Sequence, residues 1–154
     1  MAARVQTEDF DLGAEIARLR QGNPAIGAVV AFVGLVRDLN ENASVSEMTL
    51  EHYPGMTEKA LTEIEAAAKS RWDIVETLVI HRVGALQPTD QIVLVAVGSA
   101  HRHEAFAACE FIMDYLKTQA PFWKKEQTPQ GAHWVDARES DETAAQRWIP
   151  PQAK

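Results

Sequence analysis

The sequence contains the run Gln91-Ile-Val-Leu-Val-Ala-Val-Gly98, and residues 99–119 follow directly as SAHRHEAFAACEFIMDYLKTQ. The apolar run between Gln91 and Gly98 predicts a buried strand. In the second part, apolar residues recur at helical spacing and predict a helix with one buried face: Phe106, Cys109, Ile112, Met113 and Leu116. Pro121 disfavours a helical conformation at Ala120, so this helix should stop by Gln119. A buried strand followed by an amphipathic helix predicts a helix packed on a sheet.

The flanking segments extend this pattern into an α+β fold with a mixed or antiparallel sheet. Asp11 can cap a first helix that ends near Gly22, and Thr57 starts a second one after the Pro54-Gly55 turn. Further strands are expected at 26–36, 45–53 and 74–83, with a polar loop at 38–44 and a hairpin from 122–128 and 133–138. The strand at 26–36 is rich in Val, Ile and Phe, so we expect it to be buried on both faces.

Composition narrows the functional classes. The chain has 154 residues, with 15 Lys and Arg against 22 Asp and Glu, a net charge of −7. This length suits one domain, expected at residues 1–148 with a flexible tail at 149–154. An acidic total disfavours a nucleic-acid surface, and the longest apolar stretch is too short to cross a membrane. The single cysteine, Cys109, is expected to be a packed core thiol in a cytoplasmic protein.

A cluster of lysines is the most unusual chemical feature. Lys117, Lys124 and Lys125 lie within a segment that has no acidic residue from Tyr115 to Lys125. Such a local positive charge in an acidic chain is a candidate anion site. The alternative is that these lysines are solvated charges at a helix end and on an edge strand.

Two further segments could bind an anion. His101 and Arg102 open the long helix, where free backbone N–H groups favour a carboxylate or phosphate, unless Ser99 merely caps the helix. Arg37 follows a buried strand and could hold an anion with its guanidinium group, or could simply be the first exposed residue. His101 and His103 do not face the same way on a helix, so we expect no metal site. His52 and His81 lie in strands and are expected to be structural.

Several longer blocks are more specific than any single motif. They are 50–57 (LEHYPGMT), 79–84 (VIHRVG), 99–102 (SAHR), 111–117 (FIMDYLK), 120–126 (APFWKKE) and 134–138 (WVDAR). In this order and spacing the chain resembles, over about residues 27–148, the large, catalytic subunit of molybdopterin synthase. The loop at 38–44 differs from the family pattern, because it lacks the glycine often found there.

The resemblance implies sulfur transfer in molybdenum cofactor biosynthesis. The partner would be a small ubiquitin-like sulfur-carrier subunit that brings a C-terminal Gly-Gly thiocarboxylate, and the substrate cyclic pyranopterin monophosphate, which is converted to the dithiolene molybdopterin. It also implies an α/β hammerhead-type fold with an additional β-hairpin subdomain, and a central homodimer with a small subunit at each end. The donor carries its own sulfur, so neither a catalytic cysteine nor a bound cofactor is expected.

The resemblance also implies the site residues. The two active-site lysines fall on Lys117 and Lys124, with Lys125 beside them. The anion-binding residues fall on Arg37, His101 and Arg102, and the pocket-lining positions on Phe32 and Met113.

Helix geometry adds a prediction about assembly. His101 and Lys117 are 16 residues apart, which is about 24 Å along a continuous helix. One small substrate cannot touch both, so we expect His101 and Arg102 to complete the site of a neighbouring subunit. Two other functions remain open at this point: an adaptor that only binds a ubiquitin-like partner, and a phosphate-ester lyase or hydrolase that needs no sulfur donor.

Overall fold

A computed structural model describes residues 3–40, 43–44, 46–135 and 139–149. The central element is a four-stranded sheet in the order β1-β6-β8-β2, formed by β1 (Arg4–Gln6), β6 (Glu76–Arg82), β8 (Gln91–Ser99) and β2 (Ala28–Leu35). β1 is parallel to β6, whereas the β6–β8 and β8–β2 pairs are antiparallel. The sheet is therefore mixed, in agreement with the α+β prediction, and we call it the central sheet.

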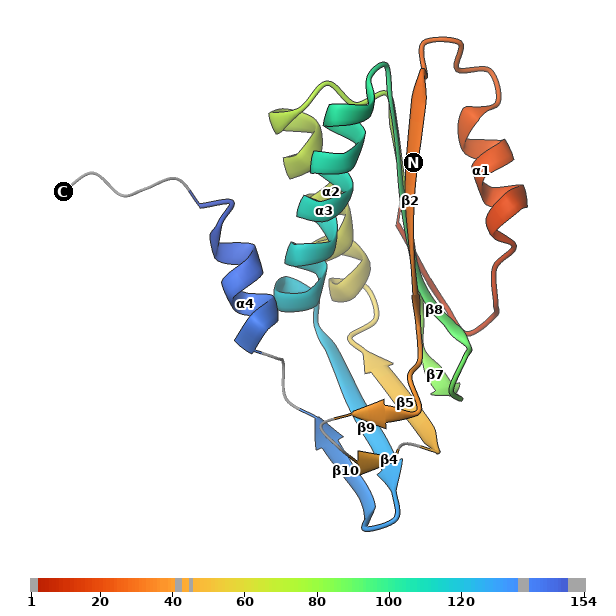
Figure 1. Ribbon diagram of the computed structural model, residues 1–154, viewed down its shortest axis with the longest axis vertical. Helices are drawn as coiled ribbons and strands as arrows, with labels where there is room; N and C mark the ends of the chain where they lie inside the picture. Colours follow the sequence, from red (N-terminus) through yellow and green to blue (C-terminus); the bar gives the residue numbers. More distant parts are fainter. Residues whose placement is uncertain (1–2, 41–42, 45, 136–138, 150–154) are drawn as a thin grey trace, which may run out of the picture.

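Helices cover both faces of the central sheet (Figure 1). α1 (Leu12–Arg20) packs on one face, where Leu19 meets Leu78, Ile80 and Leu94. α2 (Met56–Arg71) and α3 (Arg102–Gln119) pack on the other, against Val79, Val93, Val95 and Val97. Successive residues of a strand point to opposite faces, so the continuous apolar run of β8 supplies both cores at once. None of the described helices is long and apolar enough to cross a membrane.

A second, antiparallel sheet lies beyond one end of the central sheet (Figure 1). Its order is β10-β9-β5-β7, from β10 (Gly131–Val135), β9 (Phe122–Thr128), β5 (Glu47–His52) and β7 (Gly84–Leu86). We call it the distal sheet. Met48 and Leu50 of β5 are buried and alternate with more exposed neighbours, as in a strand with one covered face. The predicted hairpin is confirmed over the described residues, and its turn places Gly131 at φ +106°.

The main wrong prediction concerns β2. A strand is present, but it lies at the edge of the central sheet and is not buried on both faces. Phe32 is 41% exposed and Leu35 54% exposed. An apolar edge strand reads in the sequence like a buried one, because periodicity shows the character of the side chains and not what covers them. Exposed apolar edges of this kind are unusual in a protein that remains monomeric.

Other details also differ from the sequence prediction. Phe106 is 60% exposed, so it does not belong to the buried stripe of α3. The expected loop at 38–44 contains a small antiparallel pair, β3 (Leu39–Asn40) and β4 (Ala43–Ser44). β1, β7 and α4 (Glu139–Gln146) were not predicted as separate elements. Residues 136–138 of the expected second hairpin strand, and residues 150–154 of the expected tail, lie outside the described residues.

Candidate functional site

The relation between α3 and β2 places the first candidate residues. β2 and α3 are each antiparallel to β8 and so run in the same direction (Figure 1). The thiol of Cys109 donates to the carbonyl of Val95 over 3.7 Å, and Val95 pairs with Phe32. Four helical residues advance about as far as two strand residues, roughly 6 Å. Met113 therefore lies one step beyond Phe32, and Lys117 lies level with the end of β2.

Arg37 lies at that same end. The preceding residue, Val36, is buried against Met48 and Leu86 of the distal sheet, and its N–H donates to the carbonyl of Asp90 over 2.9 Å. These contacts fix the backbone where the two sheets meet. The exposed side chain of Arg37 therefore starts at the junction of the sheets.

Lys124 and Lys125 are separated by the alternation of β9. Lys124 pairs with Leu50. It lies on the inner face of the distal sheet, which is the face that carries the buried Met48, Leu50 and Glu126. Its Nζ lies 3.6 Å from Glu126 Oε2. Lys125 is exposed and points to the opposite face. Lys124 therefore lies on the face of the distal sheet whose Met48 packs against Val36, the neighbour of Arg37, and Lys125 points away from that face.

A buried histidine, His81, lies close enough to Lys117 to feel its charge. The ring of His81 stacks on that of Phe122, with 4.0 Å between the ring centroids, and its Nδ1–H donates to the carbonyl of Arg82 over 2.8 Å. Burial, reinforced by the positive charge of Lys117, lowers the pKa of His81 to about 4. His81 is therefore neutral at neutral pH and adds no charge to the lysine cluster. This agrees with the structural role expected for it.

His101 and Arg102 are not part of this cluster. His101 is the N-cap residue of α3 without a side-chain capping bond, and both side chains are exposed at the end of α3 far from Lys117. Ser99 belongs to β8: its hydroxyl donates to the carbonyl of Asp73 over 2.7 Å and accepts from the N–H of His101 over 3.4 Å. The N-cap residue of α3 is thus His101 and not Ser99. The separation of about 24 Å expected from helix geometry fits the uninterrupted α3.

Burial raises the pKa of the Cys109 thiol to about 12. The thiolate is the reactive form of cysteine, so this residue is a packed core thiol as expected.

In the described part of the chain, no group of three or more His, Cys, Asp or Glu side chains could hold a metal ion.

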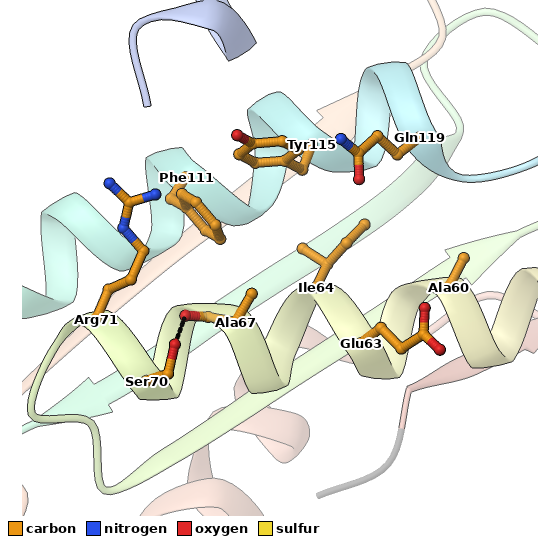
Figure 2. Close-up of a pocket in the computed structure, with 9 residues that line it drawn as sticks. All are labelled: Ala60, Glu63, Ile64, Ala67, Ser70, Arg71, Phe111, Tyr115 and Gln119. Atoms are coloured by element: carbon orange, nitrogen blue, oxygen red, sulfur yellow. Dashed lines mark hydrogen bonds between the residues drawn. The ribbon is translucent and has the colours of Figure 1, made fainter. Parts of the chain in front are cut away.

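A pocket of about 400 Å³ lies elsewhere, between α2 and α3 (Figure 2). Its walls include Ile64, Ala67 and Phe111, with Arg71 at one end and Gln119 at the other. None of the candidate cations lines it. The candidate cations therefore lie outside this pocket, and the candidate site is a different region of the surface.

Sequence reasoning missed one participant of the cluster. Glu126 is 5% exposed, and its carboxylate lies beside Lys124 on the inner face of the distal sheet. The available signal was its position two residues after Lys124, which places both side chains on one face of a strand.

The comparisons with known proteins show the family to which the chain belongs. The family model described as MoaE protein matches residues 5–119. A curated relative from Ralstonia nicotianae, named molybdopterin synthase catalytic subunit, is 72% identical over 94% of this chain and 82% of its own length. A relative of the same name from Escherichia coli K12 is 56% identical over 94% of this chain and 95% of its own.

Solved structures give the same answer. The MoaE protein of Burkholderia ambifaria MC40-6 is 59% identical, with a TM-score of 0.84 over 98% of this chain and 100% of that one. Molybdopterin synthase from Staphylococcus aureus is 34% identical, with a TM-score of 0.79 over 86% of this chain and 96% of that one. The chain belongs to the MoaE protein family, the catalytic subunits of molybdopterin synthase.

Proposed function

We propose that this enzyme transfers two sulfur atoms to cyclic pyranopterin monophosphate, one from the C-terminal thiocarboxylate of each of two small ubiquitin-like subunits. The cyclic phosphate opens, the product is the dithiolene molybdopterin, and each donor is released by hydrolysis as a carboxylate. The observation that carries the proposal is that the distal sheet meets the end of β2 beside two candidate cations: Val36, next to Arg37, packs on Met48, and Lys124 lies on the same face of the sheet as Met48. Substrate and donor are both anions, and cations placed at one point of an acidic chain attract them. Family membership supports the reaction, and the positions of these cations support a site where the two sheets meet.

In this proposal the residues have distinct roles. Arg37 binds the phosphate of the substrate with its planar guanidinium group. Lys117 acts as a general acid and base and polarises the thioacyl carbonyl, which helps the tetrahedral intermediate collapse. Lys124 shares the anionic charge, and the carboxylate of Glu126 at 3.6 Å holds its ammonium in place. Phe32 and Met113 line the approach along β2 and α3.

We further propose that the chain forms a homodimer through β2. Among the described strands, β2 has only β8 as a neighbour, so its other edge can pair with a second copy. Leu35 and Phe106 supply exposed apolar surface on β2 and on α3. A two-fold axis normal to the strand would pair β2 with its copy in antiparallel orientation.

Such a dimer would complete the site. Ala28 at the start of β2 pairs with Ser99, two residues before His101. The other end of β2, Leu35, lies two residues before Arg37. Antiparallel pairing places the start of one β2 against the end of the other. His101 and Arg102 of one protomer would then lie beside Arg37 and Lys117 of its partner, where they add positive charge for the substrate phosphate.

The small subunit is the second proposed partner. The solved structure of a Helicobacter pylori protein that shares the fold, at 19% identity and a TM-score of 0.71, is described as a complex of subunits 1 and 2 of molybdopterin-converting factor. In this proposal one small subunit binds at each end of the dimer. The chain has a hammerhead-type fold and a single domain over residues 1–148, and the enzyme is located in the cytoplasm.

A single-turnover assay tests the chemistry. The purified enzyme is mixed with the thiocarboxylated small subunit and cyclic pyranopterin monophosphate, and dithiolene product is measured. We expect Lys117→Ala to lower the rate by about 100-fold or more, the usual contribution of a general acid or base. A near-normal rate would refute the role of Lys117. Turnover of the pterin phosphate without the donor would favour a lyase or hydrolase, and donor binding without pterin binding would favour an adaptor.

A further inference from the structure

Gly34 occupies an irregular position in β2. From Ala28 to Gly34, β2 pairs with β8 one residue at a time, but Leu35 then pairs with Gln91, so that Ile92 is skipped. Ile92 is the extra residue, so this is a β-bulge of β8 opposite Gly34 and Leu35, and bulges often lie next to functional sites. Glycine in the interior of a strand commonly marks a close approach of neighbouring atoms.

The surroundings of Gly34 show what approaches it. A Cβ atom built on Gly34 would lie 2.7 Å from Val93 Cγ1 and 3.4 Å from Phe32 Cε1. The ring of Phe32 thus leans along β2 over the backbone of Gly34. This direction runs toward Arg37 and the level of Lys117. Because Phe32 is 41% exposed, part of its ring remains open to a ligand.

We propose that Gly34 is a positioning residue. Because it has no side chain, the Phe32 ring can lie against β2, and the exposed face of that ring stacks on the pterin ring of the substrate. This rests on the proposed function, in which Arg37 holds the phosphate of the same molecule. A flat ring system gains from stacking on an aromatic side chain in a fixed orientation. With the Phe32 ring held in this position, Phe32 and Arg37 together set the distance between pterin ring and phosphate in the substrates that the site binds.

The competing explanation is that Gly34 only makes room for Val93. The 2.7 Å approach to Val93 Cγ1 is the closest contact at Gly34, so a simple substitution would strain the central sheet. A test must therefore relieve Val93 and still disturb Phe32. Val93→Ala removes the γ-carbons of Val93 and serves as the reference enzyme.

The double variant Gly34→Val, Val93→Ala separates the two explanations. The γ-carbons of the valine introduced at position 34 fill the space left by Val93→Ala. They also occupy part of the space of the Phe32 ring. We expect its melting temperature to equal or exceed that of the reference. We also expect KM for cyclic pyranopterin monophosphate to rise about tenfold, the equivalent of one aromatic stacking contact. The inhibition constant of inorganic phosphate, which needs Arg37 and not Phe32, should stay the same.

Gly98→Ala is the matched control. A Cβ there would lie 2.8 Å from Ile26 Cδ1, on the α1 side of the central sheet. We expect it to lower the melting temperature without changing KM. The proposal is overturned if the double variant has the KM of the reference, or if the phosphate constant shifts equally. If the wild-type enzyme itself forms no dithiolene, the proposed function fails, and this outcome is distinct from a failure of the Gly34 proposal.

Discussion

Replacement of His81 by glutamine should change how the stability of the protein depends on pH. His81 is buried against Phe122, and burial lowers its pKa from 6.5 to about 4. The unfolded chain binds a proton on this histidine as the pH falls through 6.5, whereas the folded protein does not until about 4. Stability is therefore full above the unfolded pKa and is lost as the pH falls toward the folded one.

The size of the effect follows from these two pKa values. Between about pH 7.5 and about pH 5.5, the unfolded state gains close to one proton that the folded state lacks, which costs about 1.3 kcal/mol. For a chain of this length that is roughly 3 to 5 °C in melting temperature. His81→Gln loses the ring stack but keeps a donor for the carbonyl of Arg82. It should be less stable than the wild type near neutral pH, and the gap should narrow by about 1.3 kcal/mol at the lower pH.

Denaturant unfolding at both pH values measures this gap. Other ionisable groups are common to both proteins and cancel in the difference. His103→Gln is the control, since His103 is exposed on the first turn of α3. Its curve should run parallel to the wild type. Parallel curves for His81→Gln as well would refute a neutral, buried histidine beside Lys117.

Three further substitutions probe the surroundings of the site. Asp114→Ala removes the carboxylate that accepts from Arg147 at 2.7 Å and from the Trp148 indole at 2.6 Å. Calorimetry should show that the free energy of unfolding falls by about 2 kcal/mol, and a fall of less than about 0.5 kcal/mol would contradict this expectation. Phe106→Glu should leave the protomer folded but weaken dimerisation in sedimentation experiments, since Phe106 is 60% exposed; an unchanged dimer would argue against this surface. Lys124→Ala should lower turnover at least tenfold more than Lys125→Ala, because the two side chains lie on opposite faces of β9, and equal losses would count against the assignment.

Parts of the fold could be predicted because their sequence pattern reflects burial. β8 and α3 have a continuous apolar run and a helical stripe, and both were located within a few residues. α4 has the sequence ESDETAAQ, in which only Ala145 is buried among the residues with described side chains, so it offered no stripe to detect. β1 has three residues and gave no alternation to recognise.

The site depended on information that a linear pattern lacks. Lys124 and Lys125 are adjacent in the sequence, and only the pairing of Lys124 with Leu50 shows which of them faces the sheet junction. The exposure of β2 was missed for a similar reason, because an apolar strand at the edge of a sheet has the same composition as a buried one. The long separation of His101 from Lys117, in contrast, followed directly from helix geometry.

The central claim is that each active site is built from two protomers, and a mixed dimer tests it most directly. A Lys117→Ala chain and an Arg102→Ala chain are given different affinity tags, coexpressed and purified as a heterodimer. One site of this dimer then carries both substitutions and the other carries neither. The account predicts about half of the wild-type rate of dithiolene formation per dimer, although each variant homodimer is nearly inactive. A heterodimer no more active than the homodimers would contradict a shared site.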